Sequence, residues 1–298
     1  MQLPSFDAIE DSLATLSYGG THEDLDDERL PTVATTAQDL QQAWRLVEGC
    51  YAAKGYSHNS DGLWYDPQVL DPRTTCLLTR QPSPATVSVV FDSPLRLPAD
   101  VVFRDLLDPL RVQGRRLCEF TALAHAHPDR EYDPGTISEL FRHGWLVAAH
   151  LEDATDIMVT VHPHHVPFYR RCLLFERLGP VRNYGKVNDT PAVLMRLDLQ
   201  TAPARYRERH GARGLGAFFL NDPRRGALLA RLFRRRHAPD PWVLAYFCHQ
   251  RRDLFVHLNT DQRTWVLDQH PGLRALISDP VMAEADVRDS ARLLAVAG

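Results

Sequence analysis

Two β-rich runs of the sequence, RTTCLLTR and ATVSVVFDS, are separated by the tetrapeptide Gln81-Pro82-Ser83-Pro84. β-Branched residues favour strands, and a short proline-containing break between two such runs is typical of a turn. The pattern therefore predicts a β-hairpin within residues 73–93. The apolar runs RLCEFTALAHA and DIMVTV predict two further strands, so that a sheet forms the centre of the chain.

Three helices are predicted around these strands. Thr36 and Asp39 form a capping pattern at the start of the first, apolar residues follow at helical spacing, and Gly55 ends it. Residues 137–151 show the same spacing, and VPFYRRC, residues 166–172, predicts a short helix. With FERLGPVRNY and PAVLMRLDL as closing strands, the order of elements predicts an α/β fold with a mixed central sheet flanked by helices.

The sequence changes character on both sides of this α/β region. Residues 1–31 contain an acidic run and predict a loosely packed lead-in. Residues 32–199 hold the predicted sheet, and within them 93–115 predict a long proline-containing connection with a short helix at 103–107. Residues 200–298 are rich in arginine, alanine and leucine and predict a helical C-terminal region.

The charge balance gives no sign of a nucleic-acid-binding protein, since the net charge is -4 and the pI about 6.4. Only Lys54 and Lys186 of the 34 basic residues are lysines, so we expect anion sites built from arginine. The five cysteines lack a C-x-x-C pair, as in reduced intracellular proteins. Without a signal peptide or a membrane-length apolar run, we expect a cytoplasmic protein with no integral membrane association.

The segment HPHHVPFYRR places His162, His164 and His165 within four positions. Histidines bind metals when a third ligand accompanies them and further hydrogen bonds orient their rings, but the side chains around Pro163 are expected to splay apart. No H-E-x-x-H or H-x-E…C-x-x-C pattern is present. We therefore predict no metal site here, while a solvated turn and a segment that lines a substrate site both stay open.

The region around this segment carries a family resemblance. A strand, a helix with Phe-Tyr, an F-E-x-L-G-P run and a Pro-Ala strand occur in the order found in GNAT-type N-acyltransferases. Together with VVFDSPLRLPAD and RRLCEFTALA upstream, they resemble the N-acyl amino acid synthase family, relatives of acyl-homoserine-lactone synthases, over roughly residues 36–199. The matching residues are Val161, Pro163, His165, Phe168, Tyr169, Phe175, Glu176, Leu178, Gly179, Pro180, Pro191 and Ala192.

The resemblance implies a GNAT-like sheet and the transfer of a long-chain fatty acyl group from a thioester to the amine of an amino acid or related small amine. Superfamily members that use coenzyme A carry a Q/R-x-x-G-x-G/A loop for its pyrophosphate, whereas HPDREYDPGTISEL has Arg130 and Gly135 without that spacing. We therefore expect acyl carrier protein as the donor, through its phosphopantetheine thioester, with acyl-coenzyme A less favoured and no tightly bound cofactor.

Amide formation needs a neutral amine, and about a tenth or less of an α-amine is neutral at pH 7. We predict Glu119 as the general base, because its strand is otherwise apolar and burial would raise its pKa. The alternative is a glutamate neutralised by Arg115 or Arg116. By resemblance, Tyr169 is the tyrosine that protonates the departing thiolate, and its alternative is a core aromatic.

The substrate contacts predicted near these two residues come from strand backbone and from one histidine. A splayed or bulged strand at Thr121, Ala122 and Leu123 would present backbone N–H groups that polarise the thioester carbonyl. Relatives often have an arginine where this chain has Ala122, so the polar network is expected to differ in detail. His165 matches the family pattern and is predicted at the substrate.

An acceptor with a carboxylate favours an arginine partner, for which Arg170 and Arg182 are the candidates. Phe141 and Trp145 are predicted to line an apolar slot for the acyl chain, unless they belong to the ordinary core. A basic cluster within RRGALLARLFRRR is predicted to dock the acidic carrier protein, with a solvated helix face as the alternative. Its members are Arg224, Arg225, Arg231, Arg234, Arg235 and Arg236.

Two other functions stay open. An acyl-homoserine-lactone-type signal synthase would use the same fold and the same acyl donors. A non-catalytic GNAT-like module would bind an acyl ligand or a partner without turnover, and the departures at Ala122 and in the pyrophosphate loop keep this second alternative open. A hydrolase is not favoured, because the sequence contains no G-x-S-x-G motif.

Overall fold

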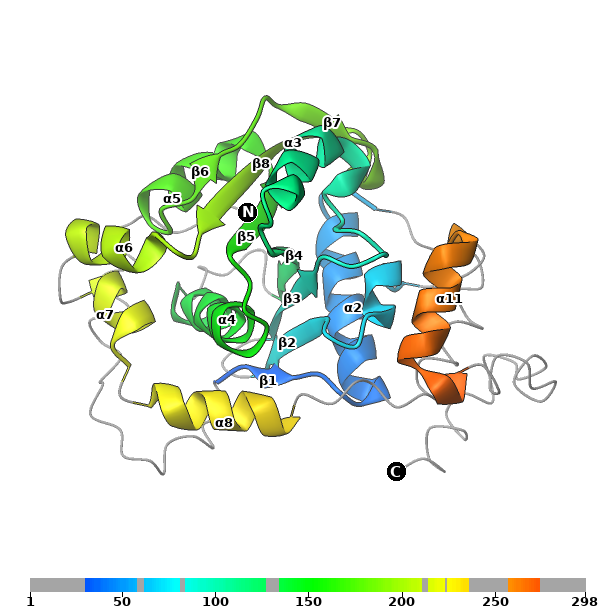
Figure 1. Cartoon of the computed structure of the whole chain (residues 1–298), viewed down its shortest axis with the longest axis horizontal. Helices are drawn as coiled ribbons and strands as arrows, with labels where there is room; N and C mark the ends of the chain where they lie inside the picture. Colours follow the sequence, from blue (N-terminus) through cyan, green and yellow to red (C-terminus); the bar gives the residue numbers. More distant parts are fainter. Residues whose placement is uncertain are drawn as a thin grey trace.

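A computed structural model describes residues 30–57, 62–80, 84–126, 134–210, 214–222, 224–235 and 257–273. These residues form one mixed eight-stranded sheet with helices around it (Figure 1). The strand order is β1-β2-β3-β4-β5-β8-β6, and β7 pairs with β8. The strands are β1 (Thr32–Val33), β2 (Thr75–Thr79), β3 (Ala85–Phe91), β4 (Leu117–His125), β5 (Asp156–Val161), β6 (Glu176–Arg177), β7 (Arg182–Tyr184) and β8 (Thr190–Asp198).

The predicted hairpin is confirmed. Strands β2 and β3 pair antiparallel, from Thr75 opposite Val89 to Thr79 opposite Ala85. Every residue of β2 is buried, which explains its unbroken run of β-branched and apolar side chains. The other strand neighbours are antiparallel too, except that β4 and β5 run parallel.

The helices described are α2 (Ala37–Ala52), α3 (Asp100–Val112), α4 (Pro134–Leu146), α5 (Val166–Arg171), α6 (Ala202–His210), α7 (Gly214–Leu220), α8 (Arg225–Arg235) and α11 (Thr260–Gln269). The predicted cap of α2 is confirmed, because the Thr36 hydroxyl accepts a hydrogen bond from the backbone N–H of Asp39 at 3.1 Å. Gly55, just beyond the helix, has a φ of +70°, a conformation that glycine adopts without strain.

Helix α3 corrects one prediction, because it is a 13-residue helix where the sequence suggested a short one at 103–107. Pro109 lies inside it, and Phe103 has a non-helical φ of -120°. The helix nevertheless continues, since Arg111 in its last turn binds the carboxylates of three aspartates from two segments. These are Asp92, Asp100 and Asp108.

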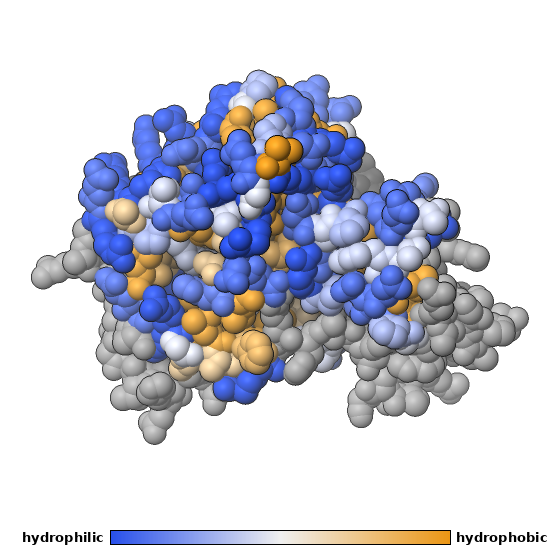
Figure 2. Space-filling model, viewed as in Figure 1, coloured by the Kyte–Doolittle hydropathy of each residue, from blue (hydrophilic) through white to orange (hydrophobic). Residues whose placement is uncertain are grey.

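The two faces of the sheet are covered by different helices. Helices α2 and α3 pack on the face to which Leu117 and Met158 point, whereas α4, α5, α6 and α8 contribute to the larger core around Phe120 and Val159. Figure 1 shows α6, α7 and α8 following one another around α4. In the same view, the surface over α3 and α5 is mostly hydrophilic (Figure 2).

The segment before α8 is joined to α4 by a buried ion pair. Arg142 of α4 is 2 % exposed and binds the carboxylates of Glu139 and of Asp222, which lies just before α8. The helical character predicted for residues 200–298 is confirmed where the structure describes them, whereas the lead-in before residue 30 lies outside the described residues. No helix within the described ranges is both long and apolar enough to cross a membrane.

Candidate active site

The parallel strands β4 and β5 pair over only three residues each. Leu117, Cys118 and Glu119 lie opposite Asp156 to Met158, and beyond Glu119 the two strands separate. On its other side, β4 pairs with β3 through a register shift, so that two residues, Ala122 and Leu123, lie opposite Val87 alone. Ala122 takes a φ of +53° there. The bulge predicted in this part of the strand is therefore confirmed.

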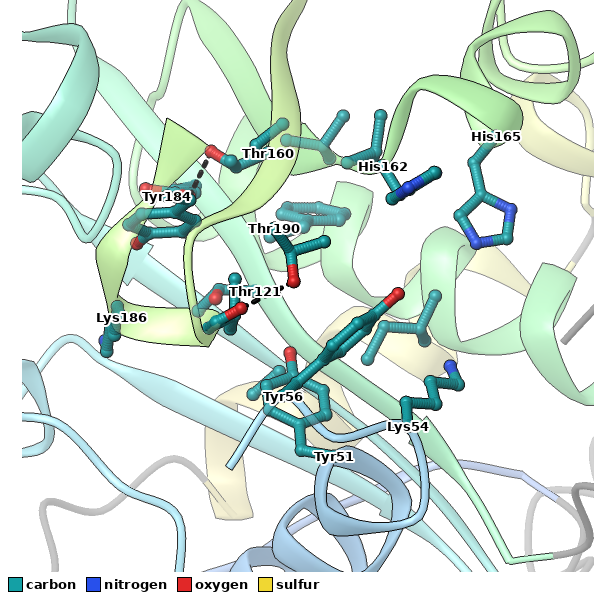
Figure 3. A pocket seen from close by; sticks show the side chains of 18 of the residues that line it. Tyr51, Lys54, Tyr56, Thr121, Thr160, His162, His165, Tyr184, Lys186 and Thr190 are labelled. Carbon is teal, nitrogen blue, oxygen red and sulfur yellow. Dashed lines mark hydrogen bonds between the residues drawn. The ribbon is translucent and has the colours of Figure 1, made fainter. Parts of the chain in front are cut away.

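A pocket fills the opening between the separated strands, and the end of α2 and the turn before β8 close its sides (Figure 3). Six of the residues predicted from the sequence as catalytic or substrate-binding line it. They are Glu119, Thr121, Ala122, Leu123, His165 and Tyr169. Residues that are far apart in the sequence thus meet where two strands part.

Glu119 is 1 % exposed at the narrow end of this opening. Its Oε2 accepts a hydrogen bond from the backbone N–H of Ala99 at 2.7 Å, and its Oε1 accepts one from the Thr160 hydroxyl at 3.0 Å. Burial raises the pKa of Glu119 to about 7, although these two hydrogen bonds and Lys186 act in the opposite direction. The carboxyl group therefore changes its charge close to neutral pH.

The two arginines that could have neutralised Glu119 bind other groups. Arg115 donates through Nε to Asp156 at 2.6 Å, and Arg116 donates through Nε to the carbonyl of Asp153 at 2.5 Å. Glu119 is thus a buried carboxyl group held by neutral donors, which is the environment expected of a general base.

Tyr169 lines the pocket from α5 and is 5 % exposed. Its ring contacts the rings of Phe168, Phe141 and Phe175 edge-on, with centroids 5.4, 5.9 and 5.6 Å away. Burial raises the pKa of Tyr169, so that the hydroxyl keeps its proton throughout the neutral range. The ring of Tyr169 packs among core aromatics, and the same side chain also lines the pocket. The position therefore fits both environments that the sequence left open.

The three histidine rings contact one another in tilted pairs at the turn between β5 and α5. Ring centroids are 4.4 Å apart for His162 and His164, and 3.6 Å apart for His164 and His165. Burial, followed by His164 and Lys54, lowers the pKa of His165 to about 3, so its ring is neutral at physiological pH. Of the three, His162 and His165 line the pocket. The described residues contain no group of three or more side chains arranged to hold a metal ion.

The sequence did not predict several of the residues that line the pocket. Tyr51, Tyr56, Trp64 and Tyr184 supply aromatic surface from elements that the family motifs do not include. Both lysines of the chain also line the pocket. The signal available in the sequence was their rarity, since every other basic side chain except histidine is an arginine.

The structure does not bring the two predicted arginines into the pocket. Arg182 binds both carboxylate oxygens of Asp105 on α3, at 2.6 and 2.7 Å, and its guanidinium lies 5.3 Å from the centre of the Phe103 ring. It therefore joins β7 to α3. Arg170 is exposed on α5 and does not line the pocket. Because the Arg182 guanidinium already binds the Asp105 carboxylate, it is not available to a substrate carboxylate.

The predicted acyl-slot residues also lie elsewhere. Phe141 packs in the core between Phe120 and Tyr169 and supports the pocket wall from behind. Trp145 contacts Tyr206 and Phe219, at centroid distances of 5.5 and 5.7 Å, on the side where α6 and α7 pack. Both belong to the main core, as the alternative interpretation of these residues allowed.

The basic cluster divides into different environments. Arg225 and Arg234 are exposed on α8, whereas Arg231 is buried and Arg224 binds Asp222 through Nε at 3.3 Å. The side chain of Arg235 and all of Arg236 lie outside the described residues. A docking role for this cluster therefore concerns Arg225 and Arg234 first. Arg231 is turned inward because it lies on the core-facing side of an amphipathic helix, next to the buried Leu228 and Leu232.

Comparison with known proteins gives three results. The family model of N-acyl amino acid synthase FeeM matches residues 42–198, the part that contains the sheet and the pocket. The solved structure of FeeM, an N-acyl amino acid synthase from uncultured soil microbes, is 22 % identical and superposes with a TM-score of 0.51 over 59 % of this chain and 92 % of that one. No curated protein sequence matches the chain. The structural likeness shows the predicted GNAT-like fold.

Proposed function

Because the chain belongs to the FeeM family of N-acyl amino acid synthases, we infer that it is an N-acyltransferase that forms N-acyl amino acids. We propose further that the acyl group is a long fatty chain and that it arrives as a thioester on acyl carrier protein. The observation that carries the proposal is Glu119, a buried carboxyl group with a pKa of about 7 at the opening between β4 and β5.

In the proposed reaction, Glu119 takes a proton from the acceptor's ammonium, directly or through one water molecule. The free amine attacks the thioester carbonyl carbon, and a C–N bond forms while the carbonyl oxygen becomes negatively charged. Because β4 stops pairing with β5 beyond Glu119 and bulges at Ala122, backbone N–H groups of this segment are proposed to stabilise that oxygen. The amine's second proton leaves with the collapse of the intermediate.

Collapse breaks the C–S bond and releases the carrier's thiol. Tyr169 is proposed to give its proton to the departing sulfur and to recover one from the amine nitrogen through the pocket. Its hydroxyl carries a proton at the neutral pH at which Glu119 ionises, as a proton donor must. The products are an N-acyl amino acid and the free thiol of the donor.

The proposed donor is supported by the sequence and by the charge of α8. The segment between β4 and α4 lacks the glycine spacing with which coenzyme A users bind pyrophosphate. Arg225 and Arg234 are exposed on α8 and provide cationic groups that an acidic carrier protein would favour. The charge-reversing double variant Arg225→Glu/Arg234→Glu should lower kcat/KM with acyl carrier protein donors and leave turnover of a small thioester unchanged.

The proposal is tested by expression and by purified enzyme. Extracts of cells that overproduce the protein should contain new N-acyl amino acids by mass spectrometry, and Glu119→Gln should suppress them by about 100-fold or more. With purified protein, acyl carrier protein should outperform acyl-coenzyme A carrying the same acyl chain. If the wild-type protein forms no N-acyl amino acid with either donor, a non-catalytic binding module would replace this function.

A further inference from the structure

The chain has only two lysines, and both line the pocket between β4 and β5. Figure 3 shows them at different ends, with Lys186 beside Tyr184 and Lys54 on the side of His165. Lys186 follows β7 and acts electrostatically on Glu119, whereas Lys54 follows the last turn of α2 and acts on His165. The two ammonium groups therefore serve different parts of one pocket.

Lys186 is already neutralised. Its ammonium lies 2.5 Å from a carboxylate oxygen of Asp66 and 5.4 Å from the centre of the Trp64 ring. Lys54 differs, because no carboxylate of the described residues lies within ion-pair distance of it, and its ammonium faces the Tyr56 ring at 5.8 Å. Lys54 as a whole residue is exposed, yet partial burial of its ammonium group lowers its pKa.

The neighbours of Lys54 do not balance its charge. His165 is neutral at physiological pH, and His162, Tyr51 and Tyr56 complete this end of the pocket with imidazole and phenol groups. Glu119 is the one carboxylate among the described residues that line the pocket. It accepts a hydrogen bond from Thr160, and Figure 3 shows Thr160 at the end of the pocket away from Lys54. The Lys54 end thus combines a partly desolvated cation with imidazole and hydroxyl groups.

We propose that Lys54 is the oxyanion-binding residue of this pocket and holds the anionic group of a substrate while the amine is deprotonated at the Glu119 end. The inference rests on the proposed N-acyltransferase function and adds a specificity-determining residue to it. An oxyanion could come from the acceptor's carboxylate or from the phosphate of the donor's phosphopantetheine. Either group would form an ion pair with Lys54, comparable to the one that Lys186 already forms with Asp66.

The rarity of lysine gives a test that does not depend on activity. Protein labelled with ¹³C at the lysine ε-carbon should show two side-chain signals, which Lys54→Met and Lys186→Met assign. We expect the Lys54 signal to titrate at a lower pH than a free lysine. Inorganic phosphate or acetate, added at constant ionic strength, should raise that midpoint and leave the Lys186 signal in place. A Lys54 signal that neither anion moves would overturn the inference, whether or not the protein turns out to be an acyltransferase.

Kinetics then identify the source of the anion. Lys54→Met should lower kcat/KM by about 10- to 100-fold, the loss expected for a hydrogen bond to a charged group. The loss should disappear for one of two substrates that lack an anion: the amide of the preferred amino acid, or the acyl thioester of N-acetylcysteamine, which has no phosphate. If the loss disappears with the amino-acid amide, Lys54 binds the acceptor carboxylate. If it disappears with the N-acetylcysteamine thioester, Lys54 binds the donor phosphate.

The control is Lys186→Met, which changes the other pocket lysine. Because Lys186 is neutralised by Asp66, this variant should keep the wild-type preference for substrate acids over amides and for carrier-bound over truncated thioesters, even if its turnover falls. A Lys54→Met enzyme that loses equal activity with every substrate, or loses none, would refute the subsite. A wild-type protein without N-acyl product would instead refute the proposed reaction, and the anion titration alone would then decide whether Lys54 binds an oxyanion.

Discussion

The hydroxyl of Thr160 on β5 donates a hydrogen bond of 3.0 Å to Oε1 of Glu119 on β4, at the point where these parallel strands stop pairing. The contact spans the narrow end of the pocket and fixes the carboxyl group by one oxygen, while the backbone of Ala99 holds the other. Both donors stabilise the ionised form, so the pKa of Glu119 settles near 7 although the group is fully buried.

This pairing predicts the pH dependence of the enzyme. As the proposed general base, Glu119 must be ionised, so kcat/KM should rise with pH through a midpoint near 7, once the titration of the free amine has been accounted for. Thr160→Val removes a donor to the ionised carboxylate and should move this midpoint to higher pH. Thr160→Ser, which retains the hydroxyl, should restore the wild-type profile. An unchanged midpoint in Thr160→Val would mean that a group other than Glu119 causes the observed pH dependence.

The same shift makes the stability of the protein pH-dependent. The folded pKa of Glu119 is about 7 and its ordinary value 4.5, so between these pH values the folded protein keeps a proton that the unfolded chain has released. The free energy of unfolding therefore falls as the pH rises from about 4.5 to 7, by roughly 3 kcal/mol for this group. Glu119→Gln should remove this loss. Denaturant unfolding at pH 5 and pH 8 should show a larger free energy of unfolding for the variant, relative to the wild type, only at pH 8.

Tyr169→Phe should lower kcat by about 100-fold if the hydroxyl protonates the departing sulfur. The ring contacts with Phe141, Phe168 and Phe175 need no hydroxyl, so the fold should persist in circular dichroism and thermal unfolding. A donor whose thiol is more acidic, such as an acyl thiophenol ester, leaves without protonation and should recover most of the activity. Equal losses with alkyl and aryl thioesters would argue that Tyr169 only shapes the pocket.

Arg142→Met should destabilise the protein by about 3–5 kcal/mol, because it removes the buried cation that Glu139 and Asp222 share and leaves Asp222 with the weaker Arg224 contact. Although burial opposes it, Arg142 lowers the pKa of both Glu139 and Asp222, and these two residues join α4 to the segment before α8. Chemical denaturation measures the change. The matched control is Glu176→Gln, whose exposed ion pair with Arg205 should contribute less than about 1 kcal/mol. A loss as small as the control's would mean that α8 is held by apolar contacts alone.

The elements that sequence patterns predicted correctly are those governed by local rules. The Thr36 cap of α2, the hairpin of β2 and β3 and the strand that carries Glu119 follow from capping, β-propensity and apolar spacing within a few residues. Helix α3 is longer than its local pattern predicts because its continuation past Pro109 depends on Arg111, which binds Asp92 from outside the helix. Ion pairs between segments have no signature in local periodicity.

The sequence likewise predicted some of the residues at the candidate site and not others. Glu119 and Tyr169 follow from an apolar strand and a family motif, whereas Arg182, predicted to bind a substrate carboxylate, binds Asp105 of the chain itself. A lone arginine in a sequence carries no information about its partner. Lys54 could not be found by motif, because it lies after α2, about 65 residues before Glu119 in the chain, and enters the pocket only when α2 packs against β4.

By itself, the sequence determined the order of the strands and helices, the family and the chemical character of Glu119 and Tyr169, because local propensity, apolar periodicity and motif spacing act along the chain. The tertiary structure decided which charges are already neutralised. It pairs Arg182 with Asp105 and Lys186 with Asp66 and leaves Lys54 facing the pocket without an ion-pair partner among the described residues. The reason is physical: whether a cation is available to a substrate depends on the carboxylates within a few ångströms of it, and only folding sets those distances.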